Sequence, residues 1–465
     1  MFLLFCFSFC STLAVFVSRA HSRGSETVTS NLGARQYALG CYHTNTSFAY
    51  EHRLGRADAL CSVYMRLRTL FLIYGLSTAA AFAAPYAMTA IENARRKTIP
   101  VNSEPPLESA PALQSRGMWS GDGPACSASN GTIYYGDAKQ SDGRDPGGNL
   151  RPFAHSLRSD FLACAVGNDG TVYLPGVSNN RAWWLNAYEP TGQMKWSVPT
   201  QEVCSRPALG GDGTVYLVSR PRSGTTVLIH YGADGSQLWE TPIGGTGWHP
   251  TAPAIAANGT IYVTAASQLV AIGSGGQEIW RVTVPHSASE NVNGLIVGED
   301  GRIFVQVVRG AVAFNERGEK LWEFLSDSQD MDGGIALGGD GTLYLASRFL
   351  YALDKTGKPK WEFKSELTYT TRDYFGHYPL IAKDGTIYAN SYYDQLYAIT
   401  PDGRKKWLVS GEPRAVTRAW GQPMLTRDGR LVTNAGWFAV PSGLASTGWP
   451  AENHDNSNSR RQENP

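Results

Sequence analysis

One pentapeptide recurs along most of this chain, and its repetition restricts the possible folds more than any other feature. It reads Asp or Asn, Gly, Thr or Arg, an apolar residue, and then an aromatic residue or valine. Eight copies begin at Asn130, Asp169, Asp212, Asn258, Asp300, Asp340, Asp384 and Asp428. Their glycines are 39 to 46 residues apart. A period of this length indicates repeated supersecondary units.

Each unit reads as four short strands joined by turns. In the copy that spans 378–408, apolar segments occupy 378–382, 386–390 and 395–399, and a fourth surrounds Trp407. Asn-Gly and Asp-Gly tolerate the positive φ of a hairpin turn, and the segments are rich in strand-forming Tyr, Val, Ile and Thr. No segment shows a sustained 3.6-residue apolar period, which argues against helical repeats. The unit is therefore predicted to be a four-stranded antiparallel meander.

A tryptophan recurs in the predicted fourth strand, usually after a turn that contains glycine. The positions are Trp196, Trp239, Trp280, Trp322, Trp361, Trp407 and Trp449. A buried tryptophan hides about 150–250 Å² of surface, so these side chains are predicted to pack the units together. We expect a structural role for them and no contact with a ligand.

Four-stranded units that cannot bury both faces alone must stack side by side, and stacking them radially produces a β-propeller. The predicted fold class is therefore all-β, with eight four-stranded blades. The first unit is the weakest, because it continues through the Gly- and Pro-rich segment 137–152 without a matching tryptophan. Seven blades and one extra hairpin are the alternative.

The repeats resemble a known family at specific positions. The best match runs through Leu350-Tyr351-Ala352-Leu353 and then Thr356-Gly357-Lys358, with Trp361 after it. This pattern is similar to the PQQ-like repeat of the quinoprotein dehydrogenase-like propeller superfamily, and the resemblance covers about 115–450. It implies the propeller fold but not one function, because the superfamily holds dehydrogenases, binding scaffolds and other secreted proteins.

The resemblance also indicates what this chain lacks. Dehydrogenases of the family bind PQQ with a pair of adjacent cysteines, a calcium site and an Asp base, but no two cysteines are adjacent here. We therefore expect neither PQQ nor calcium as a cofactor. The barrel-assembly scaffold lipoprotein of Gram-negative outer membranes shares the repeat, but it requires a lipidated cysteine after its signal, and none directly follows Ala83.

The N-terminal region contains a signal-like segment. Two basic residues, Arg66 and Arg68, follow Met65 and precede the apolar run Thr69–Phe82. The small residues Ala81 and Ala83 lie at its end, as in a secretory signal. We predict a secreted or periplasmic protein that begins at Met65 and has no stable membrane span once the signal is removed. The alternative is a start at Met1, with a signal over 1–20 and a signal anchor over 69–87.

The predicted organisation has five parts. They are a non-repeat segment (1–64), a signal-like segment (65–87), a linker (88–114), the propeller (115–450) and a polar tail (451–465). If translation starts at Met65, the segment 1–64 is an extension of the gene model and no part of the protein. A Trp-Pro ending near Pro450 is expected to close the last blade. The formal net charge of +1 and the lack of a recurring basic stripe argue against nucleic-acid binding, and we expect a monomer.

Three cysteines follow Ala87, an odd number for an exported protein. Cys126 and Cys164 occupy equivalent positions on the predicted innermost strands of adjacent blades. A bridge between them is one possibility, but buried free thiols are the favoured expectation for these residues and for Cys204.

Candidate ligand-binding residues lie in the loops that interrupt the repeat at the channel mouth, where a rigid scaffold usually places function. They are Arg206, Trp248, His249, Asn293, Asp330, Asp332, Tyr374, His377, Arg418 and Trp420. Arg, His and aromatic side chains stack and form paired hydrogen bonds with anionic or sugar-like ligands. The alternative is that these side chains fill the channel and hydrogen-bond backbone carbonyls.

The same loops contain the only candidates for chemistry. Asp330 and Asp332 with His249 or His377 could form an acid/base or metal set, but Asp-x-Asp more often caps a turn, so no metal and no catalytic residue is assigned. The predicted function is an exported binding or scaffolding module for a protein, a glycan or a small anionic ligand. The alternative is an enzyme (a lyase, hydrolase or redox protein) with its site at the channel mouth.

Overall fold

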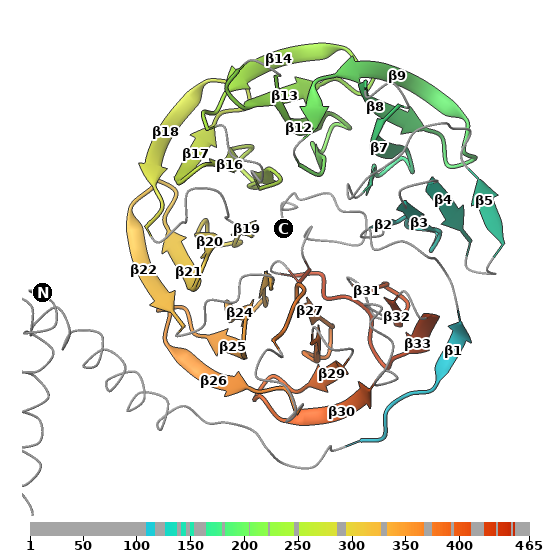
Figure 1. The fold of residues 1–465 in the computed structure, drawn as a ribbon, viewed down its shortest axis with the longest axis vertical. Coiled ribbons are helices and arrows are strands. Elements are labelled where there is room, and N and C mark those ends of the chain that lie inside the picture. The colour runs from blue at the N-terminus through green and yellow to red at the C-terminus, as the bar shows by residue number, and fades with distance from the viewer. Residues whose placement is uncertain are drawn as a thin grey trace, which may run out of the picture. The chain divides into compact units, whose positions relative to one another are not determined.

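The computed structural model confirms an all-β propeller: eight antiparallel sheets are arranged as blades around a ring (Figure 1). It describes residues 108–116, 126–136, 141–145, 149–152, 164–178, 182–203, 205–221, 224–245, 251–285, 294–326, 333–366, 374–391, 395–410, 423–433, 436–447 and 450–451. These residues all belong to one compact unit, Ala90–Pro465. The predicted segments 1–64 and 65–87 lie outside them, as does the tail beyond Ala451.

The first four blades follow the chain from the innermost to the outermost strand. Blade 1 contains β2 (Cys126–Ser127), β3 (Ile133–Gly136), β4 (Ser141–Arg144) and β5 (Leu150–Pro152). Blade 2 contains β6 (Ala165–Val166), β7 (Val172–Val177), β8 (Trp183–Tyr188) and β9 (Met194–Thr200). Blade 3 contains β11 (Ala208–Leu209), β12 (Val215–Arg220), β13 (Val227–Tyr231) and β14 (Gln237–Pro242), with the short β10 (Glu202–Val203) also on β12. Blade 4 contains β15 (Ala254–Ile255), β16 (Ile261–Ala265), β17 (Gln268–Ile272) and β18 (Glu278–Thr283).

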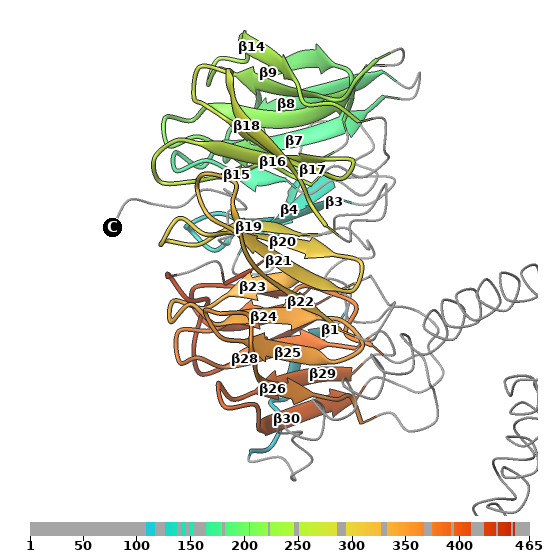
Figure 2. The same ribbon diagram turned by 90° about the vertical axis from the view of Figure 1, so that its left-hand side faces the viewer.

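The other four blades continue the ring. Blade 5 contains β19 (Leu295–Val297), β20 (Ile303–Val307), β21 (Gly310–Phe314) and β22 (Lys320–Leu325). Blade 6 contains β23 (Ile335–Leu337), β24 (Leu343–Ala346), β25 (Leu350–Leu353) and β26 (Pro359–Phe363). Blade 7 contains β27 (Leu380–Ile381), β28 (Ile387–Asn390), β29 (Gln395–Ile399) and β30 (Lys405–Ser410). Blade 8 contains β31 (Met424–Leu425), β32 (Arg430–Thr433), β33 (Gly436–Ala439) and β1 (Leu113–Arg116). Seen from the side, the blades follow one another with their strands crossing the thickness of the ring (Figure 2).

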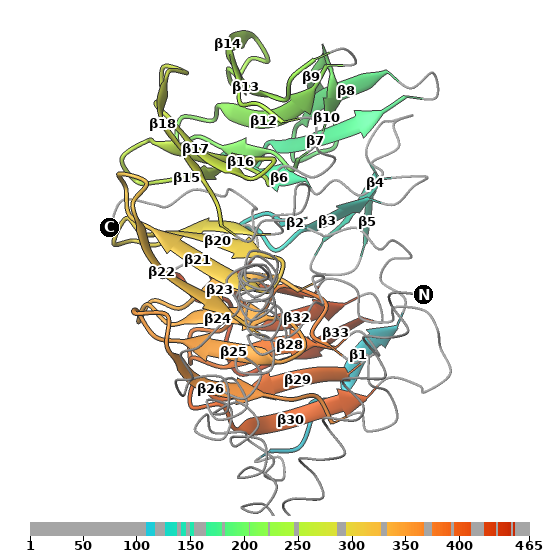
Figure 3. The same ribbon diagram turned by 60° about the vertical axis from the view of Figure 1, so that its left-hand side comes forward.

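The first strand of the propeller, β1, closes the ring by joining the last blade. Strand β1 pairs antiparallel with β33 and supplies the outermost strand of blade 8 (Figures 1 and 3). This outermost strand thus comes from the N-terminal side of the propeller, whereas the sequence prediction placed it at Trp449, which lies outside the described residues. Strand β1 begins at Leu113, two residues before the expected start of the propeller. The sequence of β1, Leu-Gln-Ser-Arg, carries no part of the repeat, so nothing local marked it as a blade strand.

The repeated Asp/Asn-Gly pairs form the turn between the first and second strand of each blade. All eight glycines have φ between 77° and 83°, a left-handed conformation that glycine adopts without strain. In seven copies the side-chain oxygen of the Asp or Asn accepts a hydrogen bond from the N–H two residues later, as Asp169 does from Thr171 at 2.9 Å. The predicted hairpin chemistry of the repeat is confirmed.

The recurring tryptophans connect each blade to the next by hydrogen bonds. The indole N–H groups of Trp196, Trp239, Trp280, Trp322 and Trp361 donate to backbone carbonyls in the last turn of the following blade, over 2.8–3.1 Å. Within its own blade each ring also packs against the aromatic residue of the pentapeptide, with centroids 5.8–5.9 Å apart. The predicted packing role of these five tryptophans is confirmed.

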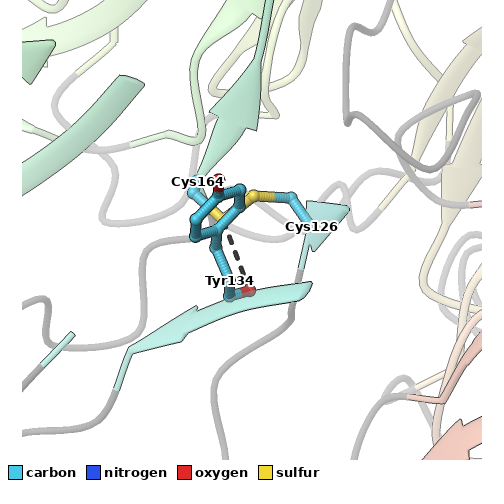
Figure 4. Close-up of a disulfide and its surroundings, with 3 residues drawn as sticks. All are labelled: Cys126, Tyr134 and Cys164. Carbon is cyan, nitrogen blue, oxygen red and sulfur yellow. Dashed lines mark hydrogen bonds between the residues drawn. A yellow bond between two sulfur atoms is a disulfide. The ribbon is translucent and has the colours of Figure 1, made fainter. Parts of the chain in front are cut away.

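A disulfide joins blades 1 and 2. Cys126, at the start of β2, and Cys164, directly before β6, are bonded with their Cα atoms 5.9 Å apart (Figure 4). The expectation of free thiols was wrong for this pair, because the innermost strands of adjacent blades lie closer together than their 38-residue separation suggests. A cross-link over a loop of this length contributes roughly 3–4 kcal/mol. Cys204 lies outside the described residues.

The C-terminal residues 442–447 and 450 form no strand of blade 8, and several of them contact blade 7. Leu444 forms a β-bridge with Ala382, and the carbonyl oxygen of Pro450 accepts the N–H of Ile381 at 2.9 Å. Of the Trp-Pro ending that was expected to close the last blade, Pro450 contacts blade 7, and Trp449 lies outside the described residues. None of the described residues forms a helix long and apolar enough to cross a membrane.

Candidate functional site

Three of the ten predicted ligand-binding residues can be placed in the structure. The other seven lie outside the described residues: Trp248, His249, Asn293, Asp330, Asp332, Arg418 and Trp420. Arg206, Tyr374 and His377 are all partly buried in loops that lead into the innermost strand of a blade. These loops are the class of segment on which the prediction was based.

Tyr374 and His377 share one loop, between blades 6 and 7. The loop is held by Phe375, which is fully buried, donates its N–H to the carbonyl oxygen of Ser347 at 2.8 Å and forms a β-bridge with Ser391. Arg206 lies on blade 3, beside a different part of the rim. Its loop is held by Ser205, whose hydroxyl donates to the carbonyl oxygen of Arg206 and accepts the N–H of Val218. The structure thus places Tyr374 and His377 in one loop but leaves Arg206 four blades earlier in the ring.

A pocket that the sequence reasoning missed lies at the other end of the innermost strands, at the Asp/Asn-Gly turns. It has a volume of about 220 Å³ and is lined by Ser127–Gly131 of blade 1, Val166–Asn168 of blade 2 and Thr426–Asp428 of blade 8. We name it the seam pocket, because it spans the junction between the last and first blades. The turns were interpreted only as hairpins, although the residues before each Asp/Asn, such as Ser129 and Arg427, differ from blade to blade.

Two charged residues of blade 8, Arg427 and Asp428, line the seam pocket and have different environments. We call the blade 8 lining, Thr426–Asp428, the blade 8 wall. Asp428 is bound by Arg430, whose Nε lies 3.0 Å from a carboxylate oxygen. Burial alone would raise the pKa of Asp428, but hydrogen bonds from Thr426 and Arg430 and the positive charge of Arg430 hold it below its usual value. Arg427 is exposed and has no acidic partner within the described ranges. Of these two lining charges, the carboxylate of Asp428 is paired with Arg430, whereas the guanidinium of Arg427 is not paired with a carboxylate among the described residues.

The outer strands carry a second surface feature, at a β-bulge directly before each recurring tryptophan. In blades 2, 6 and 7 the extra residue of the bulge is Lys195, Lys360 or Lys406. Each lysine donates to the threonine of the pentapeptide of its own blade, at 2.9–3.2 Å, and lies within 3.4–3.7 Å of its Asp. The bulge thus aims a side chain toward the first turn of the same blade.

Blades 3, 4 and 5 place aliphatic residues at the same bulge position. They are Leu238, Ile279 and Leu321, which are 52%, 52% and 47% exposed. Their strands β14, β18 and β22 follow one another around the outside of the ring (Figure 1). We call these three residues the aliphatic row. Exposed apolar residues at one equivalent position of three adjacent blades are a repeated feature of the surface, unlike apolar residues that are scattered singly.

Within the part of the chain that the structure describes, no three His, Cys, Asp or Glu side chains gather as a metal ion would require. Of the four residues considered for an acid/base or metal set, His377 is described, and His249, Asp330 and Asp332 lie outside the described residues.

Comparisons with known proteins agree with the fold. A family profile described as outer membrane protein assembly factor BamB matches residues 181–289, 229–330 and 308–436, which together span more than half of the chain. No curated protein sequence matches the chain.

Solved structures of other propellers are similar at low sequence identity. BamB from Moraxella catarrhalis has a TM-score of 0.52 and 14% identity, over 70% of this chain and 95% of that one. A streptogramin B lyase has a TM-score of 0.44 and 14% identity, over 60% of this chain and 92% of that one. Virginiamycin B lyase from Staphylococcus aureus has a TM-score of 0.45 and 15% identity, over 60% of this chain and 95% of that one. Because the profile match covers most of the blades and the repeat chemistry agrees with it, the chain belongs to the PQQ-like-repeat propeller family described as outer membrane protein assembly factor BamB.

Proposed function

We propose that this chain is an exported propeller that acts as a rigid binding or scaffolding module for a protein partner and uses neither PQQ nor calcium. Membership of a family described as an assembly factor supports the scaffolding role. The Cys126–Cys164 disulfide supports export to the periplasm or the cell exterior, because disulfides persist in oxidising compartments and are rare in the cytosol. The signal-like segment 65–87 agrees with that location.

The aliphatic row is the observation that carries the proposal. In the sister blades a lysine at this position forms hydrogen bonds within its own blade, so the position does not need an aliphatic residue for folding. Leu238, Ile279 and Leu321 leave about half of their surface in water, and burying it against a partner would gain about 25 cal/mol per Å².

Charged pairs flank the aliphatic row, as at the polar rim of a protein interface. Glu278 and Arg281 are 2.6 Å apart on β18, and Lys320 and Glu323 are 2.8 Å apart on β22. Within each pair the two charges form an ion pair with each other, and the aliphatic side chain on the same strand remains exposed to water. The expected partner is therefore a protein that presents an apolar stripe with polar residues on both sides.

A lysine substitution across the row tests the proposal. We expect the triple variant Leu238→Lys, Ile279→Lys, Leu321→Lys to fold normally, because three natural blades carry lysine at this bulge. A photo-crosslinking residue at Ile279, placed in the exported protein in its host, should capture a specific protein. That protein, once purified, should bind the triple variant at least about tenfold more weakly than the original chain.

Leu150→Lys provides a matched control, because Leu150 is 48% exposed but lies on blade 1, away from the row. Its affinity for the captured protein should equal that of the original chain. Equal binding by the triple variant would reject the row as the docking surface. Capture of a second copy of this chain, or binding only to lipid vesicles, would also contradict the proposed occupant.

A further inference from the structure

We propose that the seam pocket is a binding site for a small hydroxylated carboxylate, of the sugar-acid class. This proposal goes beyond the docking of a protein on the aliphatic row, because the pocket lies at the inner turns of blades 8, 1 and 2, whereas the row lies on the outer strands of blades 3, 4 and 5. The failure of one proposal leaves the other unchanged.

The three blades that line the seam pocket are joined to their neighbours by a hydrogen bond and a disulfide. Blades 8 and 1 are joined by Arg430, whose guanidinium donates to the carbonyl oxygen of Gly131 at 3.2 Å. Blades 1 and 2 are joined by the Cys126–Cys164 disulfide, which lies directly behind Ser127 and two residues before Val166. A site whose walls are held in place before binding loses less entropy when a ligand binds. The pocket therefore has the rigidity that small-molecule recognition requires.

The blade 8 wall is also supported from the side of blade 7. The N–H of Leu444 donates to the carbonyl oxygen of Thr426 at 3.2 Å, and the hydroxyl of Thr426 bonds Asp428 and the N–H of Arg430. The C-terminal segment continues over blade 7, where Gly443 accepts the N–H of Lys383, and reaches Gly339 of blade 6 through Thr447. It thus contacts the inner turns of blades 6 to 8, and the turn of blade 8 also lines the seam pocket.

The lining selects the ligand by charge. Arg430 neutralises Asp428, so the charge that remains for a ligand is that of the exposed Arg427. A guanidinium presents several N–H donors in a planar arrangement that matches the two oxygens of a carboxylate. An anion is therefore favoured over a cation or a neutral molecule.

The rest of the lining selects the ligand by hydrogen bonding and size. Ser129 and Asn168 are exposed at the pocket and offer a hydroxyl and an amide, groups that both donate and accept. These groups suit the hydroxyls of a sugar better than an apolar body. A volume of about 220 Å³ accommodates one small molecule, below the usual range for drug-sized ligands. Glucuronate satisfies all three criteria and is the probe that we choose.

Calorimetry on the full-length chain tests the proposal with sodium glucuronate. We expect saturable binding that weakens at least about tenfold in Arg427→Gln, because a charge-assisted hydrogen bond is lost. Lys383→Gln is the matched control, since Lys383 occupies the same position before the Asp-Gly of blade 7 and is also exposed. It should bind glucuronate like the original chain. The double variant Cys126→Ser, Cys164→Ser should bind more weakly, because two walls lose their cross-link.

Further probes distinguish the ligand class. Glucose, which has the hydroxyls but no carboxylate, and acetate, which has the carboxylate alone, should both bind at least about tenfold more weakly than glucuronate. Equal binding of inorganic phosphate would reject the sugar-acid class in favour of a general anion site. The absence of saturable glucuronate binding up to about 10 mM, or equal affinities of Arg427→Gln and Lys383→Gln, would overturn the proposal.

Discussion

At the scale of single residues, glycines with the same backbone conformation perform different tasks. Gly259 and Gly357 have φ of 83° and 81°. A Cβ on Gly259 would meet nothing within 4 Å, whereas a Cβ on Gly357 would lie 2.6 Å from the indole of Trp322 in the preceding blade. Gly259 therefore serves only its turn, but Gly357 also provides the space in which the neighbouring tryptophan packs.

This contrast predicts two different costs for the same substitution. Gly259→Ala should lose about 1–2 kcal/mol of unfolding free energy, the cost of a left-handed non-glycine residue. Gly357→Ala should lose about 1–3 kcal/mol more, because the methyl group overlaps the indole. Urea unfolding of both variants measures the difference. Equal losses would show that the tryptophan moves aside at little cost.

At the scale of strands, β13 departs from its sister strands at one position. The residue opposite the pentapeptide aromatic is alanine in five blades, as Ala352 is opposite Tyr344, but it is His230 opposite Tyr216 in blade 3. The imidazole is 6% exposed and stacks on Tyr216 with centroids 4.1 Å apart. Neither ring nitrogen has a hydrogen-bond partner within the described residues. Burial lowers the pKa of His230, and the carboxylate of Asp212 opposes this effect in part.

The lowered pKa of His230 predicts a loss of stability in mild acid. Because the folded-state pKa lies below the unfolded value of 6.5, the unfolded chain takes up this proton first as the pH falls. The contribution is fully present above pH 6.5 and is lost as the pH falls toward the folded-state pKa. His230→Ala, which restores the residue of the sister blades, should remove this part of the pH dependence. Melting temperatures of both proteins across this range provide the measurement, and parallel profiles would exclude His230 as the cause.

At the scale of the whole molecule, the ring depends on contacts between its two ends. Blade 8 takes its outer strand from β1, and the segment before β1 is anchored where the N–H of Glu108 donates to the carbonyl oxygen of Lys406 at 2.7 Å. Blade 1 has no recurring tryptophan in β5 and is held instead by Arg430 from blade 8 and by the disulfide to blade 2. The weakest blade in the sequence is thus fixed on both sides by contacts outside the repeat.

Removing β1 should therefore weaken the entire ring. A chain that begins at residue 117 loses three paired positions on β33, a cost on the order of 3 kcal/mol at about 1 kcal/mol per hydrogen bond. It should also associate through the exposed β33 edge. A chain that begins at residue 108 keeps β1 and is the control. Thermal unfolding and light scattering of the two chains measure these effects, and identical behaviour would show that β1 is dispensable.

Much of the fold was predictable because the repeat is local chemistry. Asp-Gly turns, alternating strands and the tryptophans each act within about forty residues, so the four strands of blade 7 lie close to their predicted positions. The candidate site was less predictable. Tyr374 and His377 do lie on the rim between blades, but the repeat contains no signal for the seam pocket or the aliphatic row, which arise from differences between blades.

The sequence by itself determined an all-β propeller with eight blades, because every copy of the repeat encodes the same turn and the same blade-to-blade packing. Only the tertiary structure decided how the ring closes, which cysteines pair and where a pocket forms. These features depend on residues that meet across the ring, such as Arg430 and Gly131, which are 299 positions apart. Such contacts follow from the curvature that all the blades build together, and no single repeat contains that information.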